Sequence, residues 1–323
     1  MASIRDARVL VTGADGFIGS HLVHRLVDDG AEVHALTSEV SSVFPRRLVD
    51  LRGRITIHEG NLMDRGAMDT VTRAAQPKYV FHLAAYTHVG KSWQRVDECI
   101  QANIQGTMNL LQALGGNYER FVNTGTSEIY GDIDVPFRED AIVNPISPYS
   151  VSKYAAERFC RLFQRAYGWP IVMVRPFNAY GPAQSPDRVI PEIIVRALRK
   201  EELAMTQARQ TREFNYVSDL ADGFVRAATS PGVDGEIINI GGGEEISMRD
   251  VATTILDLLG NPIEPQFGAL PERPTEIMRM YCDSTKARTL LGWSPAHTLR
   301  DGLAKTIEWY RAELEDPASP FVP

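Results

Sequence analysis

The sequence has few cysteines, and their placement suggests neither a disulfide framework nor a metal site. Only three occur among 323 residues, Cys99, Cys160 and Cys282, and none belongs to a CxxC pair. The seven histidines form no HExxH motif or other ligand-spaced cluster. We therefore expect no metal centre, and the odd, scattered set of thiols is typical of a protein of the reducing cytoplasm.

The chain also lacks a long apolar segment and an excess of positive charge. No run approaches the length of a membrane-spanning helix, and residues 1–8 lack the apolar core of a signal peptide. The formal net charge of −7 argues against non-specific binding of nucleic acid. We expect neither a membrane nor a nucleic acid as a partner. Hydrophobic residues make up 44% of the chain, enough for the core of one large or two unequal domains.

Strand-like and helix-like patterns alternate along the first half of the chain. Short apolar runs predict strands at 7–11, 31–36, 55–57, 79–83, 121–123 and 171–174. Helical spacing predicts helices at 19–29, 64–75, 97–114 and 149–167. This alternation indicates an α/β fold with a doubly wound parallel sheet covered on both faces.

The pattern changes after Arg175, where prolines and longer loops predominate. Strand and helix return at 214–228 and 237–240, and residues 246–310 are rich in helical patterns. We expect a nucleotide-binding domain over 1–176 plus about 213–241, and a smaller, discontinuous C-terminal substrate domain over about 177–212 and 242–312. The tail 313–323 contains three prolines and is expected to be frayed.

A glycine-rich pattern joins the first predicted strand to the first predicted helix. Gly13, Gly16 and Gly19 form a GxxGxxG motif. Glycine permits a tight turn, close approach of the backbone to a pyrophosphate, and close packing of helix on strand. The start of the following helix offers N–H groups to the phosphate. The motif predicts a dinucleotide site on a Rossmann-type sheet.

The end of the second predicted strand leaves NAD and NADP open. An acidic residue there would bind the adenosine ribose of NAD, whereas a nearby arginine would suit the 2′-phosphate of NADP. Glu39 would have to act from two positions beyond the usual place of the acid. Arg46 and Arg47 would suit a phosphate, although the proline before them suggests that they begin another element. Between the two dinucleotides, we favour NAD.

Two short segments further along the chain concentrate acid–base groups. Thr126, Ser127 and Glu128 follow one strand, and Tyr149 and Lys153 lie four residues apart on one face of a predicted helix. These groups suit removal of a proton from an alcohol, hydride transfer to nicotinamide, and movement of a second proton by the carboxylate. The alternative for Glu128 is a solvated or salt-bridged loop carboxylate.

Together these motifs resemble the extended short-chain dehydrogenases/reductases that act on nucleotide sugars. The resemblance covers nearly the whole chain, and its specificity comes from many matches in the family's order. Besides the glycine loop and the Tyr149/Lys153 pair, the matching segments are Asn61–Asp64, His82–Ala85, Asn103–Thr107, Arg175–Asn178, Tyr180–Pro182, Arg212–Asp219 and Leu291–Pro295.

The resemblance implies a tightly bound, recycled NAD or NADP and a nucleotide-diphosphate sugar as substrate. The implied cofactor-binding residues are Gly13, Gly16, Phe17, Ile18, Gly19, Thr37, Asn61, Leu62, Leu83, Ala84, Ala85, Asn103, Thr124, Tyr149, Lys153 and Pro176. The implied substrate-binding residues are Thr87, His88, Thr126, Asn178, Val189, Arg212 and Arg273. The two arginines suit a diphosphate because a guanidinium binds phosphate oxygens in pairs, and the alternative for either is an ordinary ion pair.

The implied catalytic residues are Thr126, Ser127, Glu128, Tyr149 and Lys153. In the family, the tyrosine transfers the proton of the sugar hydroxyl, and the serine or threonine hydrogen-bonds that hydroxyl. The lysine lowers the pKa of the tyrosine and binds the nicotinamide ribose. Thr-Ser-Glu-x-Tyr-Gly is the form seen in GDP-mannose 4,6-dehydratases, in which a carboxylate removes the proton at C5 after oxidation at C4 has made it acidic.

The sequence therefore predicts a nucleotide-diphosphate-sugar 4,6-dehydratase, with alternatives from the same family. UDP-glucuronate decarboxylases carry the same hexapeptide, and the segment 175–182 is closer to epimerases and decarboxylases. The segment 273–276 resembles 4-keto-sugar reductases. A non-catalytic dinucleotide-binding sensor is a further alternative, but such relatives usually lose the Tyr or the Lys.

The family also implies a homodimer held by a four-helix bundle formed from 97–114 and 149–167. The sequence supports this only through apolar residues on the two helices. These residues are Ile100, Ile104, Met108 and Leu111 on the first and Ala155, Phe159, Leu162 and Phe163 on the second.

Overall fold

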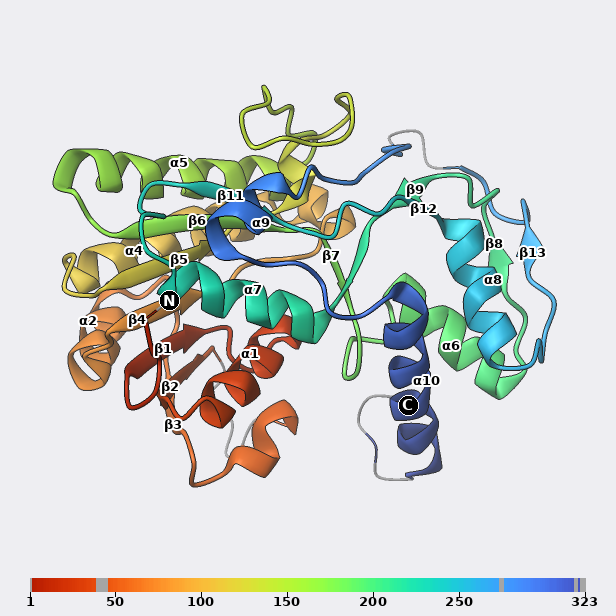
Figure 1. Cartoon of the computed structure of the whole chain (residues 1–323), viewed down its shortest axis with the longest axis horizontal. Helices are drawn as coiled ribbons and strands as arrows, with labels where there is room; N and C mark the ends of the chain where they lie inside the picture. The colour runs from red at the N-terminus through yellow and green to blue at the C-terminus, as the bar shows by residue number, and fades with distance from the viewer. Residues whose placement is uncertain (1, 39–45, 273–275, 317–318, 320–323) are drawn as a thin grey trace.

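A seven-stranded parallel sheet forms the centre of the larger part of the molecule (Figure 1). The computed structural model describes residues 2–38, 46–272, 276–316 and 319. The strand order is β11-β6-β5-β4-β1-β2-β3, so the direction of the chain across the sheet reverses between β1 and β4. Ligands of such sheets bind outside the carboxyl ends of the strands at this reversal. The predicted Rossmann-type α/β fold is confirmed.

The strands lie close to their predicted positions. Their bounds are β1 (Arg8–Thr12), β2 (Glu32–Thr37), β3 (Thr56–Glu59), β4 (Tyr79–His82), β5 (Arg120–Thr124), β6 (Ile171–Pro176) and β11 (Ile237–Ile240). Along β1, Val9 and Val11 face one hydrophobic cluster and Leu10 faces another. Because both faces of the sheet are covered, its strands are nearly continuous apolar runs, which is why the sequence predicts them.

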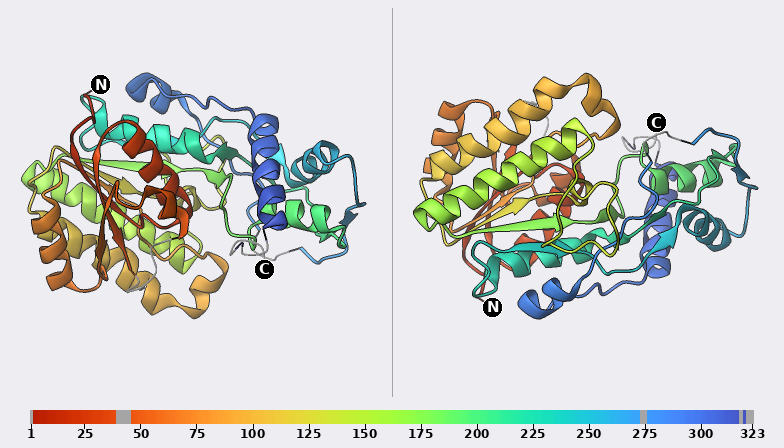
Figure 2. Two further views of the ribbon diagram at one scale, coloured as in Figure 1. Left: turned by 90° about the horizontal axis from the view of Figure 1, so that it is seen from below. Right: turned by 90° about the horizontal axis from the view of Figure 1, so that it is seen from above.

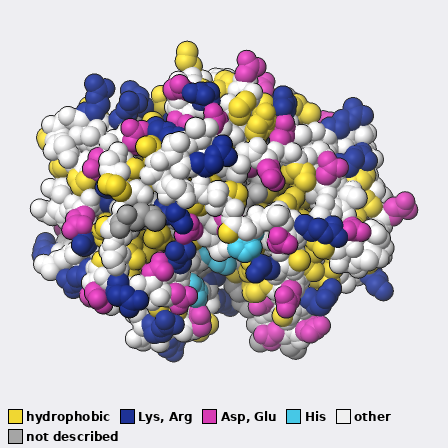
Figure 3. All heavy atoms as spheres, viewed as in Figure 1, with side chains coloured by type: hydrophobic (Ala, Val, Ile, Leu, Met, Phe, Trp, Pro, Cys, Tyr) yellow, Lys and Arg dark blue, Asp and Glu magenta, His cyan; other side chains and the backbone are white. Residues whose placement is uncertain are grey.

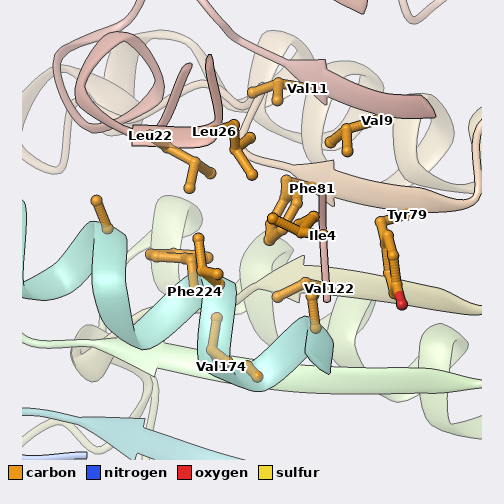
Figure 4. Packing of buried hydrophobic residues seen from close by; sticks show 14 of the residues in the cluster. Ile4, Val9, Val11, Leu22, Leu26, Tyr79, Phe81, Val122, Val174 and Phe224 are labelled. Carbon is orange, nitrogen blue, oxygen red and sulfur yellow. The ribbon is translucent and has the colours of Figure 1, made fainter. Parts of the chain in front are cut away.

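Helices cover both faces of the sheet (Figure 2). On one face lie α1 (Phe17–Asp28), α7 (Val217–Thr229) and α9 (Thr285–Leu291). On the other lie α2 (Arg65–Ala75), α4 (Gly106–Leu114) and α5 (Pro148–Tyr167). Figure 4 shows the core of the first face, where Leu22 and Leu26 of α1 and Phe224 of α7 meet strand residues such as Phe81 and Val174.

The smaller part of the molecule has its own hydrophobic cluster. It consists of α6 (Val189–Arg199), α8 (Met248–Leu258) and α10 (Leu299–Glu315), with Ile193, Ile255 and Leu303 in the shared core. Three separate two-stranded pairs lie outside the large sheet: β7 (Asn178–Tyr180) with β10 (Phe214–Tyr216), β9 (Thr211–Arg212) with β12 (Ile246–Ser247), and β8 (Ala204–Met205) with β13 (Gln266–Phe267).

Two details of the predicted domain ranges differ from the structure. Residues 285–293 fall in the range expected for the smaller domain, but Ala287, Leu291 and Trp293 pack in the core beneath α7. Burial of these apolar side chains against the sheet explains the return of the chain to the larger part. The expected frayed tail begins too early, because α10 remains helical to Glu315; residues 317–318 and 320–323 lie outside the described structure.

The segment predicted as a single helix over 97–114 contains a π-helical insertion. It runs as α3 (Val96–Cys99), the π-helical η3 (Ile100–Gln105) and α4, and Asn103 lies inside the π segment. Shorter 3₁₀ turns are η1 (Arg46–Leu51), η2 (Gly90–Gln94) and η4 (Ser127–Ile129). The π turn rotates the helix, and π segments frequently occur at functional sites.

Helix α5 is well terminated at both ends. The Ser147 hydroxyl accepts a hydrogen bond from Ser150 N, which completes a capping box, and Pro148 occupies the first turn. The helix ends at Gly168, whose φ of 68° suits a residue without a side chain. These local signals place Tyr149 in the first turn and Lys153 one turn later.

None of the helices in the described ranges is long and apolar enough to cross a bilayer.

A buried ion pair joins α5 to the sheet. Arg175 of β6 donates from Nε and Nη2 to the two carboxylate oxygens of Glu157, at 2.8 and 2.7 Å, and both side chains are only 2% exposed. Nη1 of Arg175 donates to the Tyr130 hydroxyl at 2.7 Å, which donates to Asn239 Oδ1 of β11 at 2.7 Å. The network thus connects the helix that carries Tyr149 to two strands and to the loop after β5.

Arg175→Met is expected to lower the free energy of unfolding by about 3–5 kcal/mol, because it leaves the buried Glu157 carboxylate uncompensated. The double variant Glu157→Leu/Arg175→Met should recover much of this loss, since it leaves no buried charge. Urea unfolding of the two single variants, the double variant and the wild type measures both effects. Strictly additive losses would contradict the coupling of the pair.

Candidate active site

The glycine-rich loop adopts the close-packed conformation that a dinucleotide requires. Gly13 has a φ of +65°, and a Cβ there would lie 2.8 Å from Ala84 N. A Cβ at Gly19 would lie 2.0 Å from the Gly13 carbonyl oxygen. Gly16 is the N-cap of α1, so the N–H groups of Phe17 and Ile18 begin the helix without intrahelical acceptors. This geometry fits a pyrophosphate at the start of α1.

Polar atoms without partners lie at the carboxyl end of β5. Thr124 Oγ1 and both side-chain polar atoms of Asn123 are buried, and no hydrogen-bond partner for them exists within the described residues. Buried polar groups of native proteins usually have a partner, so these atoms fit a site that receives a ligand. Together with the glycine loop, they show that the residues present suit a bound dinucleotide.

The other residues implied at the cofactor lie at the ends of neighbouring strands. Thr37 ends β2, and Pro176 ends β6. Asn61 Oδ1 accepts from Met63 N at 2.9 Å in the turn after β3, and Leu62 is buried in the second hydrophobic cluster. Leu83, Ala84 and Ala85 follow β4 beside the glycine loop. Glu39, the candidate for the adenosine ribose, lies outside the described residues.

Asn103 uses both ends of its side-chain amide within the chain. Its Oδ1 accepts from Tyr86 N at 2.7 Å, and its Nδ2 donates to Ser152 Oγ at 2.9 Å and to Tyr86 O at 3.2 Å. The Ser152 hydroxyl in turn donates to Tyr149 O at 2.8 Å. The π segment is therefore tied to the first turn of α5, and contact of Asn103 with a cofactor remains a prediction.

Thr126, Tyr149 and Lys153 come together as a buried group. The Thr126 hydroxyl accepts from Glu128 N at 3.2 Å and lies close to the Tyr149 phenol. Burial raises the pKa of Tyr149 to about 12; the Thr126 hydroxyl opposes the rise and the Glu128 charge adds to it. Burial also lowers the pKa of Lys153 to about 8. The pKa of Tyr149 is thus raised rather than lowered, and Lys153 is not among the charges that act on it.

Glu128 lies beside this group on η4, in a half-buried position. Burial raises the pKa of its carboxyl group, the Arg212 charge opposes the rise, and Glu276 adds to it. Within the described parts of the chain, no group donates a hydrogen bond to its carboxylate. The Ser127 hydroxyl is buried against Met280, with an Oγ–Sδ distance of 3.7 Å. Glu128 is therefore available for proton transfer.

Arg212 lies close to Glu128 but pairs with another acid. Its Nη2 donates to Glu276, and its Nη1 donates to Ile277 O at 2.7 Å. The amide of Asn178 donates to Glu213 O at 3.0 Å. No local pattern predicts Glu276 as the partner of Arg212, because the two residues are 64 positions apart.

The structure describes three of the four remaining implied substrate residues. Thr87 is exposed, and His88 Nε2 lies 3.9 Å from Asp187 Oδ2. Val189 begins α6 and is 38% exposed. Arg273 lies outside the described residues. Figure 3 shows a hollow between the larger and smaller parts of the molecule, with histidine side chains near it.

His82 is a further residue of the site. It belongs to the matching segment His82–Ala85, but the sequence suggested no role for it. Its Nδ1 lies 2.8 Å from Thr12 Oγ1, and its Nε2 lies 2.9 Å from Thr107 Oγ1. The Thr107 hydroxyl donates to Asn103 O, so it must accept from Nε2–H of His82, and the imidazole is neutral. His82 therefore links β1, the strand before the glycine loop, to the first turn of α4.

No group of His, Cys, Asp and Glu in the described ranges is arranged to hold a metal ion. A cavity of about 360 Å³ lies at the opposite end of the strands, lined by residues that include Tyr79, Arg120 and Thr229. It contains none of the acid–base groups described above.

Comparison with known proteins agrees with these features. The family model for GDP-mannose 4,6 dehydratase matches residues 10–306. The dTDP-glucose 4,6-dehydratase of Neisseria meningitidis serogroup B is 34% identical over 331 residues, covering 94% of this chain and 93% of the relative.

The chain belongs to the GDP-mannose 4,6 dehydratase family. The resemblance to nucleotide-sugar epimerases and dehydratases is thus confirmed, and the chain is an NAD(P)-dependent enzyme of this kind. Solved structures of epimerases share the fold. The UDP-glucose 4-epimerase of Thermotoga maritima, determined with UDP-glucose, has a TM-score of 0.88 at 32% identity and covers 95% of this chain and 99% of that one.

A second solved structure is that of the UDP-glucuronic acid 4-epimerase from Bacillus cereus, in complex with UDP-glucuronic acid and NAD. It has a TM-score of 0.85 at 30% identity and covers 94% of this chain and 99% of that one. Dehydratases and epimerases of the family therefore share one architecture, and the reaction depends on individual side chains in the site.

The stability of the protein is expected to fall in mild acid because of His82. Burial, with a smaller contribution from Lys153, lowers its pKa from 6.5 to about 3. The unfolded chain therefore binds a proton that the folded chain does not. The contribution of His82 to stability is fully present above pH 6.5 and is lost as the pH falls towards 3, by up to about 1.4 kcal/mol per pH unit.

Urea unfolding of wild type and His82→Gln between pH 7.5 and 5.5 measures this effect. The variant should be less stable at pH 7.5 but should show a shallower decline in stability with falling pH. An equal decline in the two proteins would show that His82 does not titrate as its burial requires.

Proposed function

We propose that the chain is a nucleotide-diphosphate-sugar 4,6-dehydratase that works through a 4-keto intermediate and recycles its cofactor. The observation that carries the proposal is the Glu128 carboxylate beside Thr126 and Tyr149. Arg212 pairs with Glu276, and among the described residues no group donates a hydrogen bond to the Glu128 carboxylate. A 4-epimerase does not require this carboxylate, because its 4-keto intermediate needs only to rotate.

The glycine loop, Thr124 and Lys153 would hold the dinucleotide, for which we propose NAD. The NAD in the related epimerase structure supports this choice. When bound, the nicotinamide supplies the acceptor for the hydride of the sugar C4 and the donor that returns it at C6.

Tyr149 removes the proton of the C4 hydroxyl. Thr126, which lies close to the phenol, holds that hydroxyl in place by a hydrogen bond. The Lys153 ammonium lies one helical turn away and stabilises the phenolate that forms. Both Tyr149 and Lys153 are present and buried, which argues against a non-catalytic sensor.

Glu128 carries the second proton transfer. Oxidation at C4 acidifies the C5–H bond, and the Glu128 carboxylate takes that proton. The Ser127 hydroxyl is not acidic enough to protonate a leaving hydroxyl, so Glu128 passes its proton to the C6 oxygen, which leaves as water. When hydride returns at C6, Glu128 takes a proton from solvent and delivers it to C5, and Tyr149 releases to solvent the proton that it took from the C4 hydroxyl. Burial raises the Glu128 pKa, which suits a group that alternates between base and acid.

Arg212 and Arg273 are proposed to bind the diphosphate, and Asn178, His88 and Val189 to line the sugar and base. Arg212 would exchange Glu276 for the phosphate oxygens, which bind a guanidinium in the same paired manner.

A 4-epimerase is the second candidate, supported by the solved epimerase structures that share this fold. A UDP-glucuronate decarboxylase is the third, because its motif contains the same glutamate. A 4-keto-sugar reductase would consume added NAD(P)H steadily, whereas the other three reactions regenerate the cofactor.

Mass measurement of the products separates these reactions. The protein is incubated with UDP-, GDP- and dTDP-hexoses, UDP-GlcNAc and UDP-glucuronate. Loss of one water from a hexose supports the dehydratase, and loss of carbon dioxide from UDP-glucuronate supports the decarboxylase. An unchanged mass with a new sugar configuration identifies an epimerase.

Glu128→Gln is expected to abolish loss of water while substrate still reduces the bound cofactor, because the amide cannot take the C5 proton. Absorbance at 340 nm follows the reduction, and mass spectrometry follows the product. Asp132→Asn, which alters an exposed acid four positions away, is the control and should dehydrate normally. Normal dehydration by Glu128→Gln would refute the role of Glu128 and favour the epimerase.

The protein is further proposed to be a cytoplasmic homodimer. Helices α3 and α5 and the π segment lie side by side and expose apolar side chains. These are Val96, Ile100, Val151, Phe159 and Leu162, which are 37–58% exposed. Leu111 and Phe163, predicted at this interface, instead pack in the second hydrophobic cluster. The turn of the chain at the π segment and the packing of α4 on α2 direct Leu111 inward.

Light scattering at micromolar concentration is expected to show a dimeric mass. Phe159→Glu/Leu162→Glu should yield a folded monomer, because two carboxylates would be buried in the interface. Ile142→Glu, which alters a residue 91% exposed on a loop, is the control and should remain dimeric. A monomeric wild type would refute the proposal.

A further inference from the structure

The segment 181–184 connects the sheet to the smaller part in an unusual conformation. It follows β7, and Figure 1 shows the chain there between α1 and α10. Ala183 has a φ of +62°, a region that residues other than glycine rarely occupy. Such a conformation persists where the surrounding contacts hold it, and it often marks a functional position.

Two side chains of the dinucleotide-binding part hold this segment through its carbonyl groups. His21 of α1 bonds Pro182 O from Nε2 at 2.9 Å, so Nε2 carries the proton. Arg47 of η1 donates from Nε to Ala183 O at 3.0 Å. From the opposite side, the Tyr310 hydroxyl of α10 donates to Gln184 O. The segment is therefore held between the two parts of the molecule.

Arg47 also contacts the glycine-rich loop. Its Nη1 donates to Asp15 O at 3.1 Å, and Asp15 lies between Gly13 and Gly16 in that loop. One guanidinium thus connects the middle of the dinucleotide loop to the connecting segment. It also places a positive charge beside the start of α1, where the pyrophosphate is expected.

We propose that Arg47 and His21 form a clasp that retains the dinucleotide. They are positioning residues: with segment 181–184 held against the glycine loop, the loop cannot open to release the cofactor unless these hydrogen bonds break. The inference rests on the dinucleotide site of the proposed function. It accounts for a cofactor that remains bound between its reduction and its reoxidation.

Arginines near this position can also bind the 2′-phosphate of NADP, which is a different role from the clasp. Within the described parts of the chain, the hydrogen bonds by which Arg47 holds segment 181–184 go to carbonyl groups of that segment and of the glycine loop, which both dinucleotides would meet alike. Loss of Arg47 should therefore weaken retention of NADH and NADPH by the same factor, whereas a 2′-phosphate reader would affect NADPH alone.

The test is the dissociation rate of NADH and of NADPH from the full-length protein, measured by displacement with excess NAD⁺ and the loss of nicotinamide fluorescence. Arg47→Met, which keeps the length of the side chain, should release both dinucleotides about tenfold faster or more, since it loses two charge-assisted hydrogen bonds. Arg47→Lys should also release faster, because one ammonium cannot span both carbonyls as a guanidinium does. Arg54→Met, which alters an exposed arginine beyond η1, is the control and should match wild type.

His21→Leu should release both dinucleotides severalfold faster, and His21→Gln, which retains a donor, should restore much of the retention. Thermal unfolding of each variant checks that it is folded. Wild-type rates in Arg47→Met and His21→Leu would refute the clasp, as would an effect confined to NADPH. If the wild type binds neither dinucleotide, the proposed function itself fails, and the clasp fails with it.

Discussion

The buried pair of Arg175 and Glu157 is the interaction on which the geometry of the site depends. A carboxylate this deep in the protein is tolerated only with a compensating charge and filled hydrogen bonds. Arg175 provides both and extends the network to Tyr130 in the loop after β5. Because Glu157 lies on α5 and Arg175 on β6, their pairing sets the position of the helix that carries Tyr149 and Lys153. The same network reaches the segment that carries Glu128.

Burial governs the acid–base properties of the site. It is the largest cause of the raised pKa of Tyr149 and Glu128 and of the lowered pKa of Lys153 and His82. Removal from water disfavours the charged form of each group, so phenol and carboxyl are kept protonated longer and ammonium loses its proton more readily. The sequence motifs determine which acid–base groups are present, whereas the burial of these groups shifts their pKa values.

The family relationship limits how much the fold alone can say about the reaction. Epimerase structures match this chain over nearly its whole length, and a dehydratase is about as similar in sequence. Oxidation at C4 is common to both reactions and needs only the threonine, tyrosine and lysine. The difference lies in whether a base can reach C5, and Glu128 is the residue of this site suited to that task.

Local signals determined much of the architecture and the inventory of the site. Apolar runs predicted the strands, the glycine spacing predicted the dinucleotide loop, and helical spacing predicted a helix over 149–167. Each signal acts within a few residues and can therefore be read without knowledge of distant contacts. The same is true of the Tyr149–Lys153 spacing, which follows from the helical repeat.

Contacts between distant segments were decided only by the tertiary structure. They include the place of β11 beside β6, the return of α9 to the sheet, the partnership of Arg212 with Glu276, and the inward direction of Leu111. The direction of the Tyr149 pKa belongs with them. These features depend on which distant surfaces pack together and on how much water is excluded between them. The periodicity of the sequence determines neither.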